Sequence, residues 1–367
     1  MTGHNSISNC ILVTGAAGFI GFHCTRKLLL EGYRVVGIDN MNDYYEPQLK
    51  YHRLGQLGIK PNHIEAIPPT TAVISDTFPQ FTFYRIDIKD NNNLSNVFKK
   101  EKPNYVIHLA AQVGVRYSLE NPNAYIDSNI IGFINILENC RHNAISHLVF
   151  SSSSSVYGAS RNMPYSEHHS VDHPISLYAA TKKSNELMAH SYSHLYHIPI
   201  TGLRFFTVYG PWGRPDMAYY IFAHKIMKNI PVEMFNNGNM KRDFTYIDDI
   251  VDGIEKVMLK IPVPDPSWDE NKPDPASSSA PYRIFNIGNN HPVDLFYFLQ
   301  LIESNLGKTA IKKFSPLQNG DVLDTYADIN SLYAYTGFKP TTSLERGIAI
   351  FTKWFKEYHG YSDKIPV

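Results

Sequence analysis

Three side chains near the middle of the sequence could together carry out acid/base chemistry on an alcohol or a ketone. Tyr178 and Lys182 are four residues apart where a helical pattern begins, so they share one face of that helix. A lysine ammonium beside a phenol stabilises the phenolate and lowers its pKa. A run of serines, 151–155, ends an apolar segment of strand type, and Ser153 there can share the substrate's proton. Because Tyr-x-x-x-Lys also occurs often on solvated helices, this interpretation depends on the elements that position these residues.

A glycine-rich loop near the N-terminus predicts a dinucleotide site. The β-rich segment 10–13 meets T-G-A-A-G-F-I-G (residues 14–21), and a helical pattern then runs to Leu30. Strand, glycine turn and helix are the context in which a backbone approaches a pyrophosphate at a helix N-terminus. The next predicted strand ends in Asp39, which can accept hydrogen bonds from a ribose diol. A carboxylate there repels a 2′-phosphate, and Asn40 stands where an arginine would favour NADP, so we expect NAD.

Strands and helices alternate through the first 206 residues. Strands are predicted over 10–13, 34–39, 81–87, 105–111, 147–150 and 199–206, the fifth ending at the serine run, and helices over 48–57, 94–101 and 125–141. This rhythm predicts an α/β fold with a parallel, doubly wound sheet, whose strand C-termini lie at one edge. The residues expected at that edge are the glycine loop, Asp39, Asp87, Ala110, Ser153 and Thr207. Residues 59–79 lack periodicity and are interpreted as a surface insertion.

The alternation stops after Phe206, which predicts a smaller C-terminal α/β lobe that closes over the cofactor edge. We expect residues 1–206 to form the NAD-binding domain and residues 207–367 to form the second lobe. The segments 247–259 and 282–288 are expected to return to the first domain, as a helix and a strand. Residues 261–281, rich in Pro, Ser and Asp, are expected to be a flexible excursion.

Composition excludes several classes of function. Lys and Arg number 34, as do Asp and Glu, so the net charge is zero and neither nucleic-acid binding nor a polybasic membrane anchor is expected. The three cysteines form no C-x-x-C motif, which argues against a structural metal and favours a reducing compartment. Neither a signal-peptide pattern nor an apolar run of about 20 residues is evident, so we expect a cytoplasmic protein without a membrane span.

Several motifs together resemble the extended short-chain dehydrogenase/reductases, a Rossmann-fold family that includes the NAD-dependent nucleotide-sugar epimerases. These are T-G-A-A-G-F-I-G, H-L-A-A-Q, S-S-V-Y-G, Y-x-x-x-K and R-D-F-T-Y-I-D-D. Longer matches, above all L-R-F-F-T-V-Y-G-P-W-G-R-P-D-M-A, are similar to the UDP-glucuronate 4-epimerases within that family. The resemblance runs from about Ile11 to about Tyr358. It departs from the family at 59–80 and 261–281, which are longer than expected.

The resemblance implies a role for particular residues. It implies a catalytic set of Ser153, Tyr178 and Lys182. The predicted cofactor site comprises Gly15, Gly18, Phe19, Ile20, Asp39, Asn40, Asn42, Asp87, Ile88, Leu109, Ala110, Ala111, Asn129, Ser151, Tyr178 and Lys182. The predicted substrate site comprises Arg116, Ser153, Ser154, Ser155, Tyr178, Thr207, Arg214, Arg242 and Asp321. Within it, Arg242 would hold the UDP diphosphate, Asp321 would lie near the uridine ribose, and Arg214 would face the sugar carboxylate.

The implied reaction is the reversible C4 epimerisation of UDP-glucuronate to UDP-galacturonate through a 4-keto sugar, with transient hydride transfer to bound NAD. A homodimer formed by two long helices of the first domain is a further expectation. A 4,6-dehydratase would need carboxylates where Ser154 and Ser155 stand. A UDP-glucuronate decarboxylase, or an epimerase acting on UDP-N-acetyl-glucuronate or UDP-glucose, stays open. A non-catalytic NAD-binding protein is disfavoured by the intact Ser-Tyr-Lys set.

Overall fold

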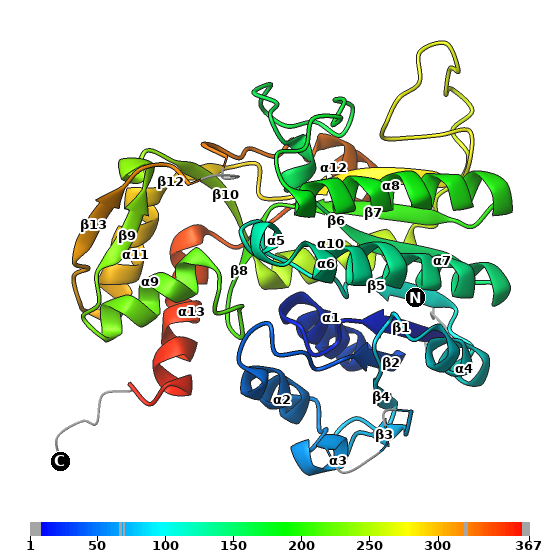
Figure 1. Ribbon diagram of the computed structural model, residues 1–367, viewed down its shortest axis with the longest axis horizontal. Coiled ribbons are helices and arrows are strands. Elements are labelled where there is room, and N and C mark those ends of the chain that lie inside the picture. Colours follow the sequence, from blue (N-terminus) through cyan, green and yellow to red (C-terminus); the bar gives the residue numbers. More distant parts are fainter. Residues whose placement is uncertain (1–8, 66–67, 69, 319–321, 362–367) are drawn as a thin grey trace.

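The computed structural model describes residues 9–65, 68, 70–318 and 322–361 (Figure 1). Its centre is an eight-stranded sheet in the order β11-β7-β6-β5-β1-β2-β4-β3, in which all neighbours are parallel except β3 and β4. This confirms the predicted parallel, doubly wound sheet. The strands are β1 Cys10–Thr14, β2 Arg34–Asp39, β3 Val73–Ile74, β4 Phe81–Arg85, β5 Tyr105–His108, β6 His147–Ser153, β7 Ile200–Phe205 and β11 Tyr282–Ile287.

Helices cover both faces of this sheet, so its inner strands are largely buried. Strand β1, for example, is buried at every residue. On one face α1 packs against α10, and on the other α7 lies between α4 and α8. The helices of this region are α1 Phe19–Leu30, α2 Pro47–Gln56, α3 Pro61–Glu65, α4 Asn91–Glu101, α5 Tyr117–Glu120, α6 Pro122–Tyr125, α7 Gly132–His142, α8 Leu177–Tyr196 and α10 Ile247–Leu259.

The sheet order reverses at β1, whose neighbours are β2 on one side and β5 on the other. The loops that follow such strands diverge, which opens a crevice at their carboxyl ends. The glycine loop follows β1, Asp39 ends β2, and Ser153 ends β6. The residues predicted to bind a cofactor therefore lie along one edge of the sheet.

A smaller group of elements lies beside that edge (Figure 1). It contains a sheet of order β12-β10-β8 and the parallel pair β9 and β13. Its elements are β8 Thr207–Tyr209, α9 Ala218–Met227, β9 Val232–Phe235, β10 Lys241–Tyr246, β12 Pro292–Asp294, α11 Leu295–Leu306, β13 Lys312–Ser315 and α13 Leu344–Tyr358. Helix α12 Asn330–Thr336 packs instead against β11 of the large sheet. As predicted, 247–259 is a helix and 282–287 adds strand β11 to the large sheet beside β7. The domain ranges themselves stay predictions.

Two segments differ in detail from the sequence-based expectations. The region 59–79, interpreted from its lack of periodicity as a surface insertion, contains α3 and β3, and β3 pairs with the outer edge of β4 so that this edge is not left open. The helix expected over 125–141 begins with a π-helical segment, η1 Ile126–Ile131. Within η1 the Asn129 carbonyl accepts a hydrogen bond from Asn185 Nδ2 at 2.6 Å, which competes with the regular helical pairing.

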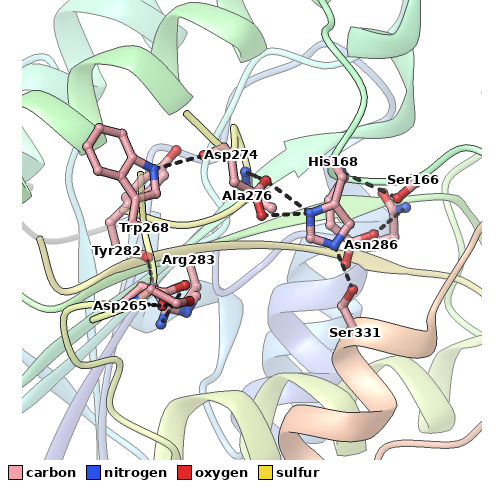
Figure 2. A network of polar contacts seen from close by, with 12 residues as sticks. Ser166, His168, Asp265, Trp268, Asp274, Ala276, Tyr282, Arg283, Asn286 and Ser331 are labelled. Carbon is pink, nitrogen blue, oxygen red and sulfur yellow. Dashed lines mark hydrogen bonds and ion pairs between the residues drawn. The ribbon is translucent and has the colours of Figure 1, made fainter. Parts of the chain in front are cut away.

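The excursion between α10 and β11 projects from the body of the protein as a long loop, drawn in yellow in Figure 1. Its base is nevertheless tied to the fold by side-chain contacts, which Figure 2 shows. Asp274 accepts from His168 Nδ1 at 2.8 Å, and Arg283 Nη2 lies 3.7 Å from Asp265. Among the described helices, none has both the length and the apolar character needed to cross a membrane.

Candidate active site

A cavity of about 950 Å³ lies between the carboxyl edge of the large sheet and the smaller group of elements. This volume is near the upper end of the usual range for small-molecule sites, about 300–1,000 Å³. Every predicted cofactor residue except Asn129 lines it, as do the predicted substrate residues Arg116, Ser153, Ser154, Ser155, Tyr178, Thr207, Arg214 and Arg242. Asp321 lies outside the described residues. One cavity therefore receives both predicted sets.

The first glycine of the loop packs directly against the backbone that follows β5, which only a residue without a side chain can do. Gly15 has φ +72°, and a Cβ there would meet the Ala110 nitrogen at 2.8 Å. Gly18 precedes the first residue of α1 and offers no side-chain cap to the amide groups of that helix. An uncapped helix N-terminus beside a bare backbone is suited to a pyrophosphate. The residues present thus fit the phosphate portion of NAD.

Asp39 is held at the end of β2 by two backbone amides. Ala17 N donates to Oδ2 at 3.1 Å and Met41 N donates to Oδ1 at 2.8 Å. These bonds leave carboxylate lone pairs for a ribose diol. Lys50 Nζ is 3.9 Å from Asp39 and donates to the main-chain and side-chain oxygens of Asn42. This buried lysine therefore connects α2 to the loop that follows β2. Sequence reasoning missed Lys50, because nothing in the pattern of α2 indicates which residue would turn toward β2.

Asn129 lies behind the cavity wall. Its side chain accepts from Gln112 N at 2.8 Å and donates to Thr181 Oγ1 at 3.0 Å. It therefore connects the segment after β5 to α8. At the outer rim, Asn40 Nδ2 donates to Asp87 Oδ2 at 3.1 Å, which brings the ends of β2 and β4 together.

Helix α8 places Tyr178 and Lys182 at the end of β6. Ser176 caps the helix by accepting from Ala179 N at 3.2 Å, so Tyr178 lies in the first turn and Lys182 one turn later. Lys182 Nζ donates to the Ser151 carbonyl at 2.7 Å and to Ser151 Oγ at 3.2 Å. Burial lowers the pKa of Lys182 to about 7, although the charge of Glu186 opposes this shift.

The tyrosine differs from the sequence-based expectation. Burial raises the pKa of Tyr178 above its ordinary value, while a hydrogen bond with Ser153 and the charge of Arg214 lower it less strongly. The lysine that was expected to lower this pKa is directed at Ser151 instead. In the protein alone Tyr178 is therefore a neutral phenol at neutral pH, with Ser153 as its hydrogen-bonding neighbour.

A buried ion pair supports α8 from behind. Arg204 on β7 donates to both oxygens of Glu186, from Nε at 2.8 Å and from Nη2 at 2.9 Å. Ser152 Oγ also donates to Glu186 at 2.7 Å. These bonds join β6, β7 and α8 beneath the predicted catalytic residues. Sequence reasoning missed both partners, although Glu186 stands one turn after Lys182.

The loop before α9 places Arg214 in the wall of the cavity that Tyr178 also lines, and the charge of Arg214 lowers the pKa of Tyr178. Its guanidinium is bound in bidentate fashion by Asp216, from Nε to Oδ1 at 3.0 Å and from Nη2 to Oδ2 at 2.5 Å. Tyr44 Oη donates to the same carboxylate at 3.2 Å. Sequence reasoning identified Arg214 but neither Asp216 nor Tyr44. The charge pattern R-P-D at 214–216 was the only signal that could have indicated the pair.

The far end of the cavity carries the other predicted arginines. Arg242 on β10 donates from Nη1 to the Leu323 carbonyl at 2.6 Å and from Nη2 to the Val322 carbonyl at 2.7 Å. The Arg116 guanidinium carbon lies 4.7 Å from the centroid of the Phe235 ring. Both cations line the cavity, so this end is suited to an anionic, aromatic group such as a nucleotide.

Comparison with known proteins assigns the chain and its relatives to one family. The model of the NAD dependent epimerase/dehydratase family matches residues 11–268. The chain is similar to the protein CapI of Staphylococcus aureus, with 51% identity over 95% of this chain and 99% of that one. It is similar to a probable UDP-glucuronate 4-epimerase of Rhizobium meliloti, with 44% identity over 94% and 96% of the chains. The crystal structure of a Bacillus cereus UDP-glucuronic acid 4-epimerase in complex with UDP-glucuronic acid and NAD has a TM-score of 0.78, with 32% identity over 95% and 99% of the chains.

Proposed function

The chain belongs to the NAD dependent epimerase/dehydratase family, and on that premise we propose that it interconverts UDP-glucuronate and UDP-galacturonate by epimerisation at C4. The observation that carries the substrate assignment is the position of Arg214. Arg214 lines the same cavity as Tyr178, so a carboxylate on the sugar can be bound by a guanidinium within the cavity that holds the proposed base. The UDP-glucuronic acid 4-epimerase of Bacillus cereus supports the same substrate.

NAD, when bound, supplies the acceptor and then the donor of the C4 hydride. The chain's own residues manage the proton. Tyr178 must first be deprotonated; as phenolate, its oxygen takes the proton of the C4 hydroxyl and returns it after the sugar has turned over, and Ser153 shares a hydrogen bond with it. Because burial raises the pKa of this phenol in the protein alone, proton removal needs further positive charge near it. Lys182, which is held at Ser151 one turn away, is the residue we assign to that task.

Several features separate this function from related chemistry. Ser154 and Ser155 line the cavity where a 4,6-dehydratase would need carboxylates. Both are hydroxyl groups and cannot serve as an acid and a base at neutral pH. A UDP-glucuronate decarboxylase shares the 4-keto sugar, so product identity is the property that distinguishes it from an epimerase.

The decisive experiment is incubation of the purified protein with UDP-glucuronate without added NAD, followed by NMR of the products. We expect UDP-galacturonate, at an equilibrium approached from either side, with no net reduction of the cofactor. A pentose nucleotide would identify a decarboxylase. Faster conversion of UDP-glucose or UDP-N-acetyl-glucuronate in parallel reactions would change the substrate. Conversion of none of these sugars by NAD-loaded protein would contradict the proposal.

We further propose a cytoplasmic homodimer in which α7 and α8 meet the same helices of a second copy. This is supported by exposed apolar side chains on α8 and η1, including Leu187, Leu195 and Ile131, which a partner would cover. The three buried cysteines are free, which suits a reducing compartment. Light scattering after size-exclusion chromatography should give twice the chain mass, and Leu195→Glu should reduce it to one. A wild-type mass of one chain would contradict the dimer.

A further inference from the structure

The guanidinium expected to bind the sugar carboxylate already holds a carboxylate of its own chain. Arg214 and Asp216 are joined by two parallel bonds, the geometry in which arginine binds any carboxylate most strongly. The charge of Arg214 lowers the pKa of Asp216 despite the opposing effect of burial, so Asp216 is ionised at neutral pH. A uronate entering the cavity therefore meets a neutralised arginine, unless Asp216 moves.

The position of Asp216 allows such a movement. It lies in the loop before α9, its side chain is 29% exposed, and it lines the cavity together with Arg214. Its third contact, the Tyr44 hydroxyl, comes from the loop after β2 and is long at 3.2 Å. Rotation of one short side chain toward water would free the Nε and Nη2 edge of Arg214 without moving the backbone.

We propose that Asp216 is a specificity-determining residue, an internal carboxylate that occupies Arg214 in the empty cavity and is displaced by the carboxylate of the sugar. This inference rests on the proposed function. It deepens that function by explaining how the site discriminates between sugars. A uronate replaces one carboxylate by another, whereas a sugar with a neutral C6 group leaves the Arg214–Asp216 pair closed. The exchange also means that the cavity never contains an unpaired arginine, which would be costly in a partly enclosed site.

The alternative role for Asp216 is to hold Arg214 in a fixed orientation as a brace. In that case Asp216 would keep Arg214 oriented while the substrate used the remaining Nη1 group. The two roles predict opposite signs for the same substitution. Removing the charge of Asp216 would release Arg214 to the substrate if the carboxylates exchange. It would disorder Arg214 and weaken uronate binding if Asp216 is a brace.

The test is calorimetric titration of NAD-loaded protein with UDP-glucuronate and UDP-glucose, in a Tyr178→Phe background that prevents turnover. Adding Asp216→Asn should tighten UDP-glucuronate binding about tenfold, because the uncharged amide can accept only one of the two bonds that Arg214 now donates to Asp216. UDP-glucose binding should stay within about twofold. Asp269→Asn, which removes the same charge from an exposed residue of the 261–281 excursion, should change neither affinity. The double variant Arg214→Ala/Asp216→Asn should bind UDP-glucuronate no more tightly than Arg214→Ala alone.

A milder variant provides a second measurement if Asp216→Asn folds poorly. Tyr44→Phe keeps the ring but removes the bond to Asp216, so UDP-glucuronate should bind about threefold more tightly. Unchanged or weaker uronate binding in either variant, with a parent protein that prefers UDP-glucuronate to UDP-glucose, would overturn the exchange and leave the proposed function intact. A parent that lacks this preference would overturn the uronate assignment, and the exchange with it.

Discussion

Replacing Lys182 by methionine should change how the stability of the NAD-free protein depends on pH. The lysine side chain is 2% exposed, and burial lowers its pKa from an ordinary value of 10.5 to about 7. The difference of 3.5 units corresponds to about 5 kcal/mol of free energy, at about 1.4 kcal/mol per unit. This is the most that a charged Lys182 can cost the folded state relative to a neutral one. Methionine fills a similar volume and carries no charge.

The sign follows from proton binding in the two states. The folded-state pKa lies below the unfolded-state value, so between about pH 7 and pH 10.5 the unfolded protein binds more protons at this site. In that window the contribution of Lys182 to the free energy of unfolding rises with pH. Below about pH 7 the lysine is charged in both states and its full cost is present. The Lys182→Met variant lacks the two hydrogen bonds to Ser151 at every pH, a constant that cancels from the slope.

Urea unfolding of NAD-stripped protein at about pH 6, 7.5 and 9 tests this prediction. The stability of wild type relative to Lys182→Met should rise by about 2 kcal/mol between the two higher values and by less than half as much, about 0.8 kcal/mol, between the two lower ones. Lys99→Met, at an exposed position on α4, is the matched control and should give a flat difference. A difference for Lys182→Met that is equally flat would refute the reasoning, because it would mean that the buried amine keeps an ordinary pKa.

Three further predictions concern binding and turnover. Tyr178→Phe should abolish epimerisation, measured by NMR, yet retain UDP-sugar binding. Ser153→Ala should only slow the reaction, because water can partly replace the hydroxyl. Substantial activity of Tyr178→Phe would contradict the proton-transfer role. NAD should co-purify with the protein and be preferred over NADP. Asp39→Ala should weaken NAD binding by about 1–3 kcal/mol in calorimetry and reduce that preference. An unchanged NAD affinity and an unchanged preference would exclude a contact between Asp39 and the ribose. Arg214→Ala should weaken UDP-glucuronate binding by about 2 kcal/mol. This is the lower end of the usual cost of losing a charged partner, because Asp216 already neutralises the arginine. The variant should also raise the share of pentose product, and an unchanged affinity without such a rise would exclude Arg214 from the substrate site.

The sequence by itself determined the features that depend on local pattern. Buried strands of a parallel sheet are apolar on both faces, so their alternation with helices could be recognised in the sequence. The C-termini of such strands lie at one edge of the sheet. The glycine of the first turn was legible for a similar reason, since Gly15 needs a positive φ and touches the Ala110 backbone. The four-residue spacing placed Tyr178 and Lys182 on one helical face.

Only the tertiary structure decided which charges meet. Lys50 reaches Asp39 from α2, Arg204 reaches Glu186 from another strand, and Tyr44 reaches Asp216 across 172 residues of chain. No periodicity encodes such pairings, because each depends on side chains that separate elements turn toward a common space. The pKa of Tyr178 illustrates the consequence. Local spacing to a lysine predicted a lowered value, but burial, a property of the whole fold, outweighs the lowering effects of Ser153 and Arg214 and raises the pKa instead.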